Sequence, residues 1–247
     1  MAEPVVIYEK IGKIAYITLN RPSKLNAMNP EMSSELDKVW VDFQNDDNLW
    51  TAIITGAGRA FCSGADVEDL DKDFPLSTPG LSVELDKPVI AAINGYCLGV
   101  GFFITVYSDI RIAAEDAQFG YPEGKIGITA GGASCLVRYM PAAIAMEMLF
   151  TGKNISAQRA YEIGFVNAVV PAQQLMDEAT KMAEVINENA PLVNRALKKL
   201  VSKSYYPTPR EQGIAFSRII SPLRKSEDAV EGRRAFLEKR NPSFQAK

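Results

Sequence analysis

Short apolar runs separated by polar turns dominate the first half of the 247-residue chain. Residues Val5–Leu19 alternate loosely between apolar and polar positions around a break at Gly12, which predicts a two-stranded hairpin. Three later runs are almost continuously apolar, namely Thr51–Thr55, Val89–Ile93 and Ile110–Ala114. Short apolar runs of this kind predict strands that are buried in the core.

Helical segments are expected between these strands. Asn29-Pro30 opens a predicted helix that runs to about Phe43, with proline in its first turn. A second apolar segment, Phe102–Tyr107, is expected to form a buried helix. Residues 59–87 are rich in Asp, Ser, Gly and Pro, which predicts a mobile loop around one short helix. The alternation of strands and helices predicts an α/β core.

The second half of the chain is predicted to be mostly helical, with one short strand at Val166–Val170. The expected helices are Gly131–Tyr139, Pro141–Leu149, Ser156–Ile163, Ala172–Asn189, Pro191–Ser202, Pro209–Ile220 and Ser226–Lys239. We therefore expect one core domain, residues 1–190, followed by an appended helical region, residues 191–247.

Candidate chemistry centres on the stretch Pro88–Ala114, where a predicted strand, a glycine-rich turn and a buried helix follow one another. Asn94, Gly95, Gly99 and Gly101 interrupt the apolar pattern. A turn of this kind directs free backbone N–H groups, at the positive end of a helix, toward a bound molecule. The alternative is a tight strand-to-helix connection that binds nothing, since most such glycines only satisfy turn geometry.

Composition excludes several classes of protein. The hydrophobic fraction of 47% and the charged fraction of 23% are those of an ordinary globular protein. A net charge of −3 argues against an electrostatic nucleic-acid binder. No apolar run is long enough to span a membrane and the first ten residues lack a secretion-signal pattern, so we expect a cytoplasmic location.

The chain contains no histidine, which excludes Ser-His-Asp and Cys-His nucleophiles and every histidine-ligated zinc site. Cys62, Cys97 and Cys135 are too few and too scattered for a disulfide framework or a thiolate metal cluster, and we expect no metal site. Acid–base chemistry must therefore come from carboxylates, lysine, tyrosine or cysteine.

Three motifs occur together in a distinctive order and spacing. They are AFCSGAD at Ala60–Asp66, INGYCLGVG at Ile93–Gly101 and AQFGYPE at Ala117–Glu123. With these motifs, and with the ending EGRRAFLEKR at Glu231–Arg240, the chain resembles the crotonase (enoyl-CoA hydratase/isomerase) superfamily over essentially its whole length.

The resemblance implies an α/β spiral of ββα units with a C-terminal helical region, assembled as a homotrimer or a dimer of trimers. It implies an acyl-CoA thioester as substrate, with coenzyme A as part of that substrate and no permanently bound cofactor. Two backbone N–H groups, those of Ala65 and Val100, would hold the thioester oxygen as an oxyanion hole. The residues that would contact the substrate or its CoA are Lys24, Ser63, Ala65, Asp66, Val67, Glu68, Gly99 and Val100. Lys24 is a candidate for the nucleotide end, and a solvated loop charge is the equal alternative.

Two departures from the family pattern bear on the reaction. Val100 stands between Gly99 and Gly101 where family members often have a third glycine; its N–H survives if φ stays negative, and its side chain narrows the pocket. Phe103 occupies the place of the first hydratase glutamate, whereas the second is retained as Glu123. The pattern is similar to that of Δ3,Δ2-enoyl-CoA isomerases, which keep only the later glutamate.

The leading interpretation is therefore an enoyl-CoA isomerase in which Glu123 moves a proton from C2 to C4, in a pocket that includes Phe103 and Tyr121. Burial among Phe103, Phe119 and Tyr121 would raise the pKa of the Glu123 carboxyl. Hydration, thioester hydrolysis and decarboxylation on the same scaffold remain alternatives, because a fold does not fix its chemistry. A CoA-binding protein without catalysis is the alternative from another class.

Overall fold

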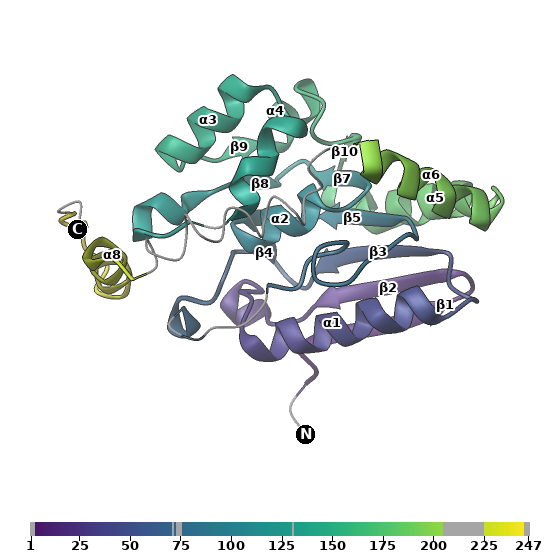
Figure 1. Ribbon diagram of the computed structural model, residues 1–247, viewed down its shortest axis with the longest axis horizontal. Helices are drawn as coiled ribbons and strands as arrows, with labels where there is room; N and C mark the ends of the chain where they lie inside the picture. The colour runs from purple at the N-terminus through teal and green to yellow at the C-terminus, as the bar shows by residue number, and fades with distance from the viewer. Residues whose placement is uncertain (1–2, 71, 73–75, 130, 205–224, 245–247) are drawn as a thin grey trace. The chain divides into compact units, whose positions relative to one another are not determined.

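The computed structural model describes residues 3–70, 72, 76–129, 131–204 and 225–244 (Figure 1). The chain divides into two compact units. The first unit comprises residues 1–119 and 156–204, and the second comprises residues 120–155 and 205–247.

A six-stranded sheet forms the centre of the first unit. Its strands lie in the order β1 (Val6–Ile11), β2 (Ile14–Leu19), β3 (Thr51–Gly56), β5 (Val89–Ile93), β7 (Ile110–Ala114) and β10 (Ala168–Val170). The strands β1 and β2 form the predicted antiparallel hairpin, and every later neighbour pairs in parallel. The apolar runs thus form the strands that the sequence predicts.

Helix α5 (Leu175–Asn187) covers one face of this sheet. Ile53, Ile90 and Ile112, from three neighbouring strands, pack against this helix in one buried cluster. Fully burying one such side chain stabilises the fold by about 1.5–3 kcal/mol. The alternate positions, such as Ile54 and Ala91, are buried on the opposite face, which explains why these strands read as continuous apolar runs.

A second sheet of short strands lies in the order β4 (Ala60–Cys62), β6 (Tyr96–Leu98), β8 (Gln118–Gly120) and β9 (Ile155–Ser156). The strands β4, β6 and β8 each come directly after a strand of the large sheet in the sequence. β4 follows β3, β6 follows β5, and β8 follows β7. Helical segments then return the chain, which confirms the expected α/β spiral of ββα units. The sequence did not predict these strands, because two or three residues are too few to show a periodicity.

The remaining helical elements of the first unit are η1 (Pro22–Lys24), α1 (Pro30–Asn45), η2 (Val67–Asp69), α2 (Val100–Val106), α4 (Ala157–Glu162), η5 (Ala172–Gln174) and α6 (Pro191–Ser204). The predicted start of α1 is confirmed, because the Asn29 side chain accepts a hydrogen bond from the Met32 N–H at 2.9 Å. The expected loop after Gly58 begins instead with β4, and η2 is its one short helix among the described residues.

The second unit contains η3 (Pro122–Ile126), η4 (Gly131–Arg138), α3 (Ala142–Thr151) and α8 (Glu227–Leu237). The helix expected at Gly131–Tyr139 is a 3-10 helix, and the one expected at Pro209–Ile220 lies outside the described residues. Residues 191–204 belong to the first unit and residues 225–244 to the second. The expected core at residues 1–190 and assembly region at residues 191–247 stay predictions.

The described residues contain neither a helix that could span a membrane nor a cluster of potential metal ligands. None of their helices is both long enough and apolar enough to cross a membrane. Nor do these residues bring three or more His, Cys, Asp or Glu side chains together in an arrangement that could hold a metal ion.

Candidate active site

Two neighbouring parallel strands of the small sheet carry the predicted N–H donors. β4 pairs with β6, with Cys62 opposite Cys97. The chain leaves both strands at the same edge, and Ala65 and Val100 follow within three residues of the two strand ends. The loops touch there, because a Cβ built on Gly64 would lie 3.6 Å from the Leu98 carbonyl oxygen. The fold of the first unit therefore brings the two predicted donor loops together.

The loop at Ala65 is held by a short parallel bridge to Met28. The Met28 N–H donates to the Gly64 carbonyl at 2.8 Å, and the Asp66 N–H donates to the Met28 carbonyl at 2.8 Å. In such a bridge the residue between the two bonded positions directs its own N–H away from the partner strand. Among the described residues, the N–H of Ala65 has no hydrogen-bond partner. It is available to a ligand.

Val100 is the first residue of α2, and the N–H groups of the first turn of a helix have no partner within that helix. The earliest bond of this turn runs from the Phe103 N–H to the Gly99 carbonyl at 3.1 Å. The φ of Val100 is not positive, as the preserved donor requires, and its side chain is 3% exposed. Val100 therefore fits into the core in place of a glycine, and its backbone N–H keeps the direction that the predicted donor requires.

Gly101 allows α2 to begin directly against β4. A Cβ at this position would lie 2.5 Å from the Cys62 carbonyl oxygen and 2.6 Å from the Cys62 Cβ, closer than real side chains approach. Every residue of α2 is buried, and Phe102 packs with Phe119 and Phe165 at ring-centroid distances of 6.2 and 5.2 Å. The start of the helix is thus fixed by backbone contact and by aromatic packing.

Acidic residues near Ala65 are already paired with cations. Asp66 is 5% exposed, caps η2 by accepting from the Glu68 N–H, and forms an ion pair with Arg21 at 3.0 Å. Arg21 also donates to the Ala27 carbonyl, so this pair ties the loop after β2 to the loop after β4. Lys24 pairs with Glu68 at 2.9 Å on the surface, and this hydrogen bond raises the pKa of Lys24.

Sequence reasoning missed Arg21 and Met28, which support the Ala65 loop. Asn20-Arg21-Pro22 reads as the end of the hairpin, and an ion pair between residues 21 and 66 leaves no trace in local spacing. The predicted roles of Lys24, Ser63, Val67 and Gly99 toward CoA stay predictions.

Other residues that the sequence singles out have structural roles. Phe103 is 4% exposed, which is consistent with core packing. Asp109 accepts hydrogen bonds from the Val89 N–H at 2.8 Å and from the Lys198 ammonium at 2.7 Å, so it fixes a turn. Cys62 and Cys97 are fully buried, and burial raises the pKa of the Cys97 thiol.

In the second unit, Glu123 is the second residue of η3. Its carbonyl oxygen accepts the Ile128 N–H at 3.1 Å, and the neighbouring Tyr121 is buried, with its hydroxyl 3.0 Å from Thr129 Oγ1. The carboxyl Oε2 is buried and has no hydrogen-bond partner in the described part of the chain. Burial raises the pKa of Glu123 to about 8, which confirms the predicted direction. A carboxyl group of this strength can both accept and return a proton near neutral pH.

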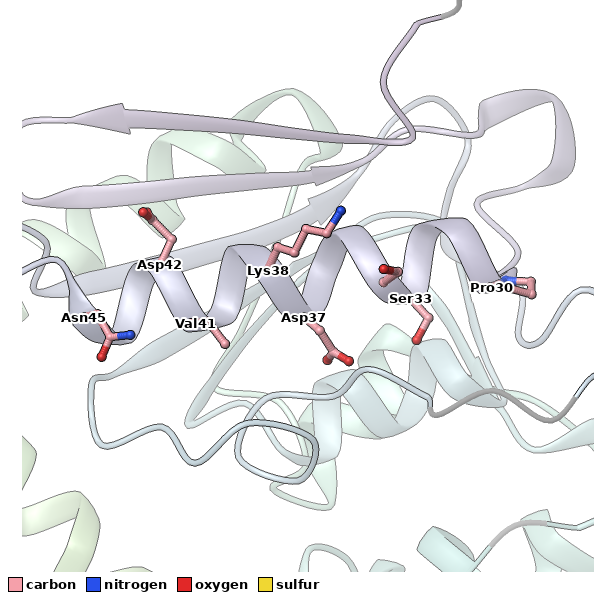
Figure 2. Close-up of a pocket in the computed structure, with 8 residues that line it drawn as sticks. Pro30, Ser33, Asp37, Lys38, Val41, Asp42 and Asn45 are labelled. Atoms are coloured by element: carbon pink, nitrogen blue, oxygen red, sulfur yellow. The ribbon is translucent and has the colours of Figure 1, made fainter.

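A separate hollow of about 720 Å³ runs beside α1 (Figure 2). Residues along one helix line it, namely Pro30, Ser33, Ser34, Asp37, Lys38, Val41, Asp42 and Asn45. The figure shows Asp37, Val41 and Asn45 projecting from the same side of α1. None of the predicted site residues lies among them, so this hollow is not the candidate active site.

The sequence matches the model of the enoyl-CoA hydratase/isomerase family over residues 9–247, nearly the entire chain. The chain belongs to this family. The predicted membership of the crotonase superfamily is therefore confirmed, and the chain is an enzyme that acts on acyl-CoA substrates.

Similar proteins cover nearly the full length of this crotonase-family chain. A carnitinyl-CoA dehydratase of Citrobacter koseri is 39% identical, covering 97% of this chain and 98% of the relative. An (E)-benzylidenesuccinyl-CoA hydratase of Thauera aromatica is 38% identical, again with 97% and 98% covered. The crystal structure of a carnitinyl-CoA hydratase from Mycobacterium avium superimposes with a TM-score of 0.90 at 35% identity, covering 100% of both chains. These relatives are named as hydratases or dehydratases and not as Δ3,Δ2-isomerases.

Proposed function

We propose that this enzyme moves a proton at C2 of a CoA thioester, with Glu123 as its one acid–base side chain and the N–H groups of Ala65 and Val100 as the oxyanion hole. The observation that carries the proposal is the buried carboxyl of Glu123, whose pKa is raised to about 8, combined with Phe103 in place of a second acid. A single carboxyl group suffices when one proton is taken from a substrate and returned to it.

The proposed reaction shifts the double bond of a 3-enoyl-CoA. The Glu123 carboxylate takes a proton from C2, the electrons move onto the thioester oxygen to form a dienolate, and the same carboxyl delivers the proton to C4. The product is the conjugated 2-enoyl-CoA, with no change in composition. Each N–H donor would stabilise the negative oxygen by roughly 3–4 kcal/mol relative to the ground state.

The free N–H groups of the first unit support this mechanism. Ala65 and Val100 follow adjacent parallel strands, and neither amide is used by the described residues. The acids closest to Ala65 in sequence, Asp66 and Glu68, are engaged with Arg21 and Lys24. A paired carboxylate is a poor candidate for a second catalytic base, which favours proton transfer by Glu123 alone.

Hydration or dehydration is the second candidate, favoured by the names of the relatives. One carboxyl group could run it as a syn reaction: Glu123 would take the C2 proton and pass it to the hydroxyl leaving from C3, releasing water. The reverse steps add water to a 2-enoyl-CoA. This route demands that one carboxyl reach both C2 and the C3 oxygen on the same face of the substrate.

The deciding experiment is an assay of purified protein on 3-enoyl-CoA, 2-enoyl-CoA and 3-hydroxyacyl-CoA of several chain lengths. Chromatography with mass spectrometry separates isomer, hydrate and free acid in a single run. We expect isomerisation of 3-enoyl-CoA to be fastest, and Glu123→Gln to lower it at least ~100-fold. The matched control is Glu147→Gln, which makes the same change on the exposed surface of α3 and should leave the rate unchanged.

Each result has a distinct meaning. Faster hydration than isomerisation would select the second candidate, and free acid would select a hydrolase. CoA binding with no turnover of any thioester would make the protein a non-catalytic binder. An unchanged rate in Glu123→Gln would overturn the proposed role of Glu123.

Assembly and location form the remaining part of the proposal. We propose a homotrimer or a dimer of trimers in the cytoplasm, on the basis of the family resemblance. Light scattering of the purified protein gives the subunit count, and a monomer would overturn the proposed assembly.

A further inference from the structure

The segment that carries Glu123 packs against helix α8 through direct contacts between backbone atoms. A Cβ at Gly232 would lie 2.8 Å from the Gly127 N, and the carbonyl carbon of Ile126 would be closer still. On the other side of the contact, a Cβ at Gly127 would lie 2.8 Å from the Asp228 carbonyl carbon. Because both partners are glycines, η3 and α8 approach more closely than any side chain allows.

Helix α3 contacts the same segment. Gly152, at the C-terminal end of α3, contacts the Lys125 side chain. A Cβ built on Gly152 would lie 2.8 Å from the Lys125 Cε. Glu123 and Lys125 belong to one 3-10 helix of five residues. The helix that presents the carboxyl is thus in contact with both α3 and α8.

Helix α8 is itself held by hydrogen bonds at its start and in its middle. Ser226 caps its start by accepting from the Ala229 N–H at 3.1 Å. In the middle of the helix, the Glu231 carboxylate accepts hydrogen bonds from the Arg240 guanidinium at 2.6 and 3.0 Å and from the Ser243 N–H at 2.9 Å. The Arg240 hydrogen bonds lower the pKa of Glu231 to about 2. Glu231 directly precedes Gly232, so Arg240 and Ser243 fold back beside the contact with η3.

We propose that α8 is a positioning element for Glu123, and that the backbone contact between Gly232 and Ile126–Gly127 sets where the Glu123 carboxyl lies. The inference rests on the proposed function only in assigning Glu123 as the proton carrier. Gly232 acts through η3 and touches no substrate in this account, so it is a positioning residue.

Charged groups on the elements packed against η3 do not cause the raised pKa of Glu123. They are Lys125 on η3, Glu147 on α3, and Glu227, Asp228, Glu231, Arg233 and Arg234 on α8. The pKa of Glu123 is raised by burial, and only its own backbone N–H opposes the rise. A displacement of η3 would therefore change that pKa through solvent exposure.

The test is Gly232→Ala, with Gly124→Ala as the matched control. Alanine is a better helix former than glycine, so α8 itself should persist, but the new methyl group must push α8 and η3 apart. Gly124 lies in η3 next to Glu123, and a Cβ there would have no atom within 4 Å among the described residues. Both variants add one methyl group, but only the methyl group of Gly232→Ala collides with the backbone of Ile126 and Gly127.

The first readout is independent of activity. Infrared difference spectra between each protein and its Glu123→Gln counterpart isolate the carbonyl band of the protonated carboxyl, which is followed over a pH titration. We expect the midpoint to fall by at least roughly one pH unit in Gly232→Ala, as solvation favours the ionised form. It should not move in Gly124→Ala.

The second readout is the rate profile of whichever thioester reaction the enzyme runs. We expect Gly232→Ala to lower kcat at least roughly tenfold with KM changed by less than about threefold, and to shift the rising limb of the pH–rate curve downward. A lower melting temperature with an unmoved infrared midpoint and an unmoved pH limb would overturn the inference and leave Gly232 with a folding role. If the wild-type enzyme turns over no thioester, the proposed function fails while the infrared titration still decides the positioning role.

Discussion

The loops that carry the free N–H groups and the segment that carries Glu123 are held in place by different means. The loops at Ala65 and Val100 continue from paired strands, and the Ala65 loop is also held by hydrogen bonds with Met28 and by the partly buried Arg21–Asp66 pair. Glu123 lies instead on a short 3-10 helix that rests on glycine contacts. Its carboxyl Oε2 has no partner among the described residues.

In the proposed mechanism, this difference corresponds to what each part must do. An amide that stabilises developing charge is most effective when it is already aligned, and strand pairing provides that alignment. An acid–base group must change its charge during the reaction, and a carboxyl fixed by strong hydrogen bonds in one protonation state resists that change. The proposal thus assigns stabilisation of the charge to the aligned amides of the first unit, and proton transfer to the Glu123 segment.

The largest expected effect is a pH dependence of the free energy of unfolding that arises from the burial of Glu123. A carboxyl whose pKa rises from 4.5 to about 8 on folding keeps a proton that the unfolded chain releases between those pH values. The stabilisation is therefore fully present below pH 4.5 and is lost as pH rises through 8. Relative to Glu123→Gln, the wild type should lose roughly 4–5 kcal/mol at most over this interval. Urea unfolding of both proteins from pH 5 to 9 measures the difference, and parallel curves would contradict the burial of this carboxyl.

A second prediction concerns the ion pair beside Ala65. Asp66→Asn leaves the Arg21 guanidinium without its buried counter-charge and should destabilise the fold by roughly 3 kcal/mol. The KM for acyl-CoA should rise as well, because the Ala65 loop loses a support. Glu35→Gln removes the exposed Lys38–Glu35 pair on α1 and should change neither stability nor KM measurably. Thermal unfolding and steady-state kinetics check both, and equal effects would show that burial does not distinguish the two pairs.

A third prediction concerns the contact that brings α2 against β4. Gly101→Ala inserts a methyl group where the Cys62 carbonyl lies 2.5 Å away, so the two donor loops must separate. We expect a loss of roughly 1–3 kcal/mol in stability and weaker binding of acyl-CoA. Calorimetry on the wild type, this variant and Gly124→Ala provides the comparison. Unchanged binding in a destabilised protein would mean that the spacing of the loops does not matter.

The smallest expected effect concerns Lys24. If this residue contacts the nucleotide end of CoA, Lys24→Ala should raise KM roughly threefold to tenfold and leave kcat unchanged. Lys38→Ala removes a comparable exposed charge from α1, where it pairs with Glu35, and should leave KM as it is. Equal KM values in the two variants would identify Lys24 as a solvated loop charge.

Much of the first unit could be predicted from the sequence, because its strands bury both faces and therefore appear as apolar runs. Thr51–Gly56, Val89–Ile93 and Ile110–Ala114 all formed strands of the large sheet. The short strand Tyr96–Leu98 was missed, since three residues between glycines show no period. Local spacing also gives no indication of a contact between distant segments, such as the Arg21–Asp66 pair.

The second unit was harder to predict. The motif identified Glu123 as a candidate acid, but the letters Pro-Glu-Gly-Lys describe an ordinary surface turn, and only the fold shows the buried Oε2. The contact between Gly127 and Gly232 joins residues more than a hundred positions apart. The only sequence feature that pointed to this region was the resemblance of Glu231–Arg240 to the ending of family members.

Helix α2 is buried from its first residue to its last, and this has a consequence for how the enzyme can change. A residue with no solvent-facing side can be exchanged only for one of similar volume, so random variants at Val100–Val106 should be strongly depleted in a selection for function. Adaptation to another acyl group would then have to arise in segments outside this helix.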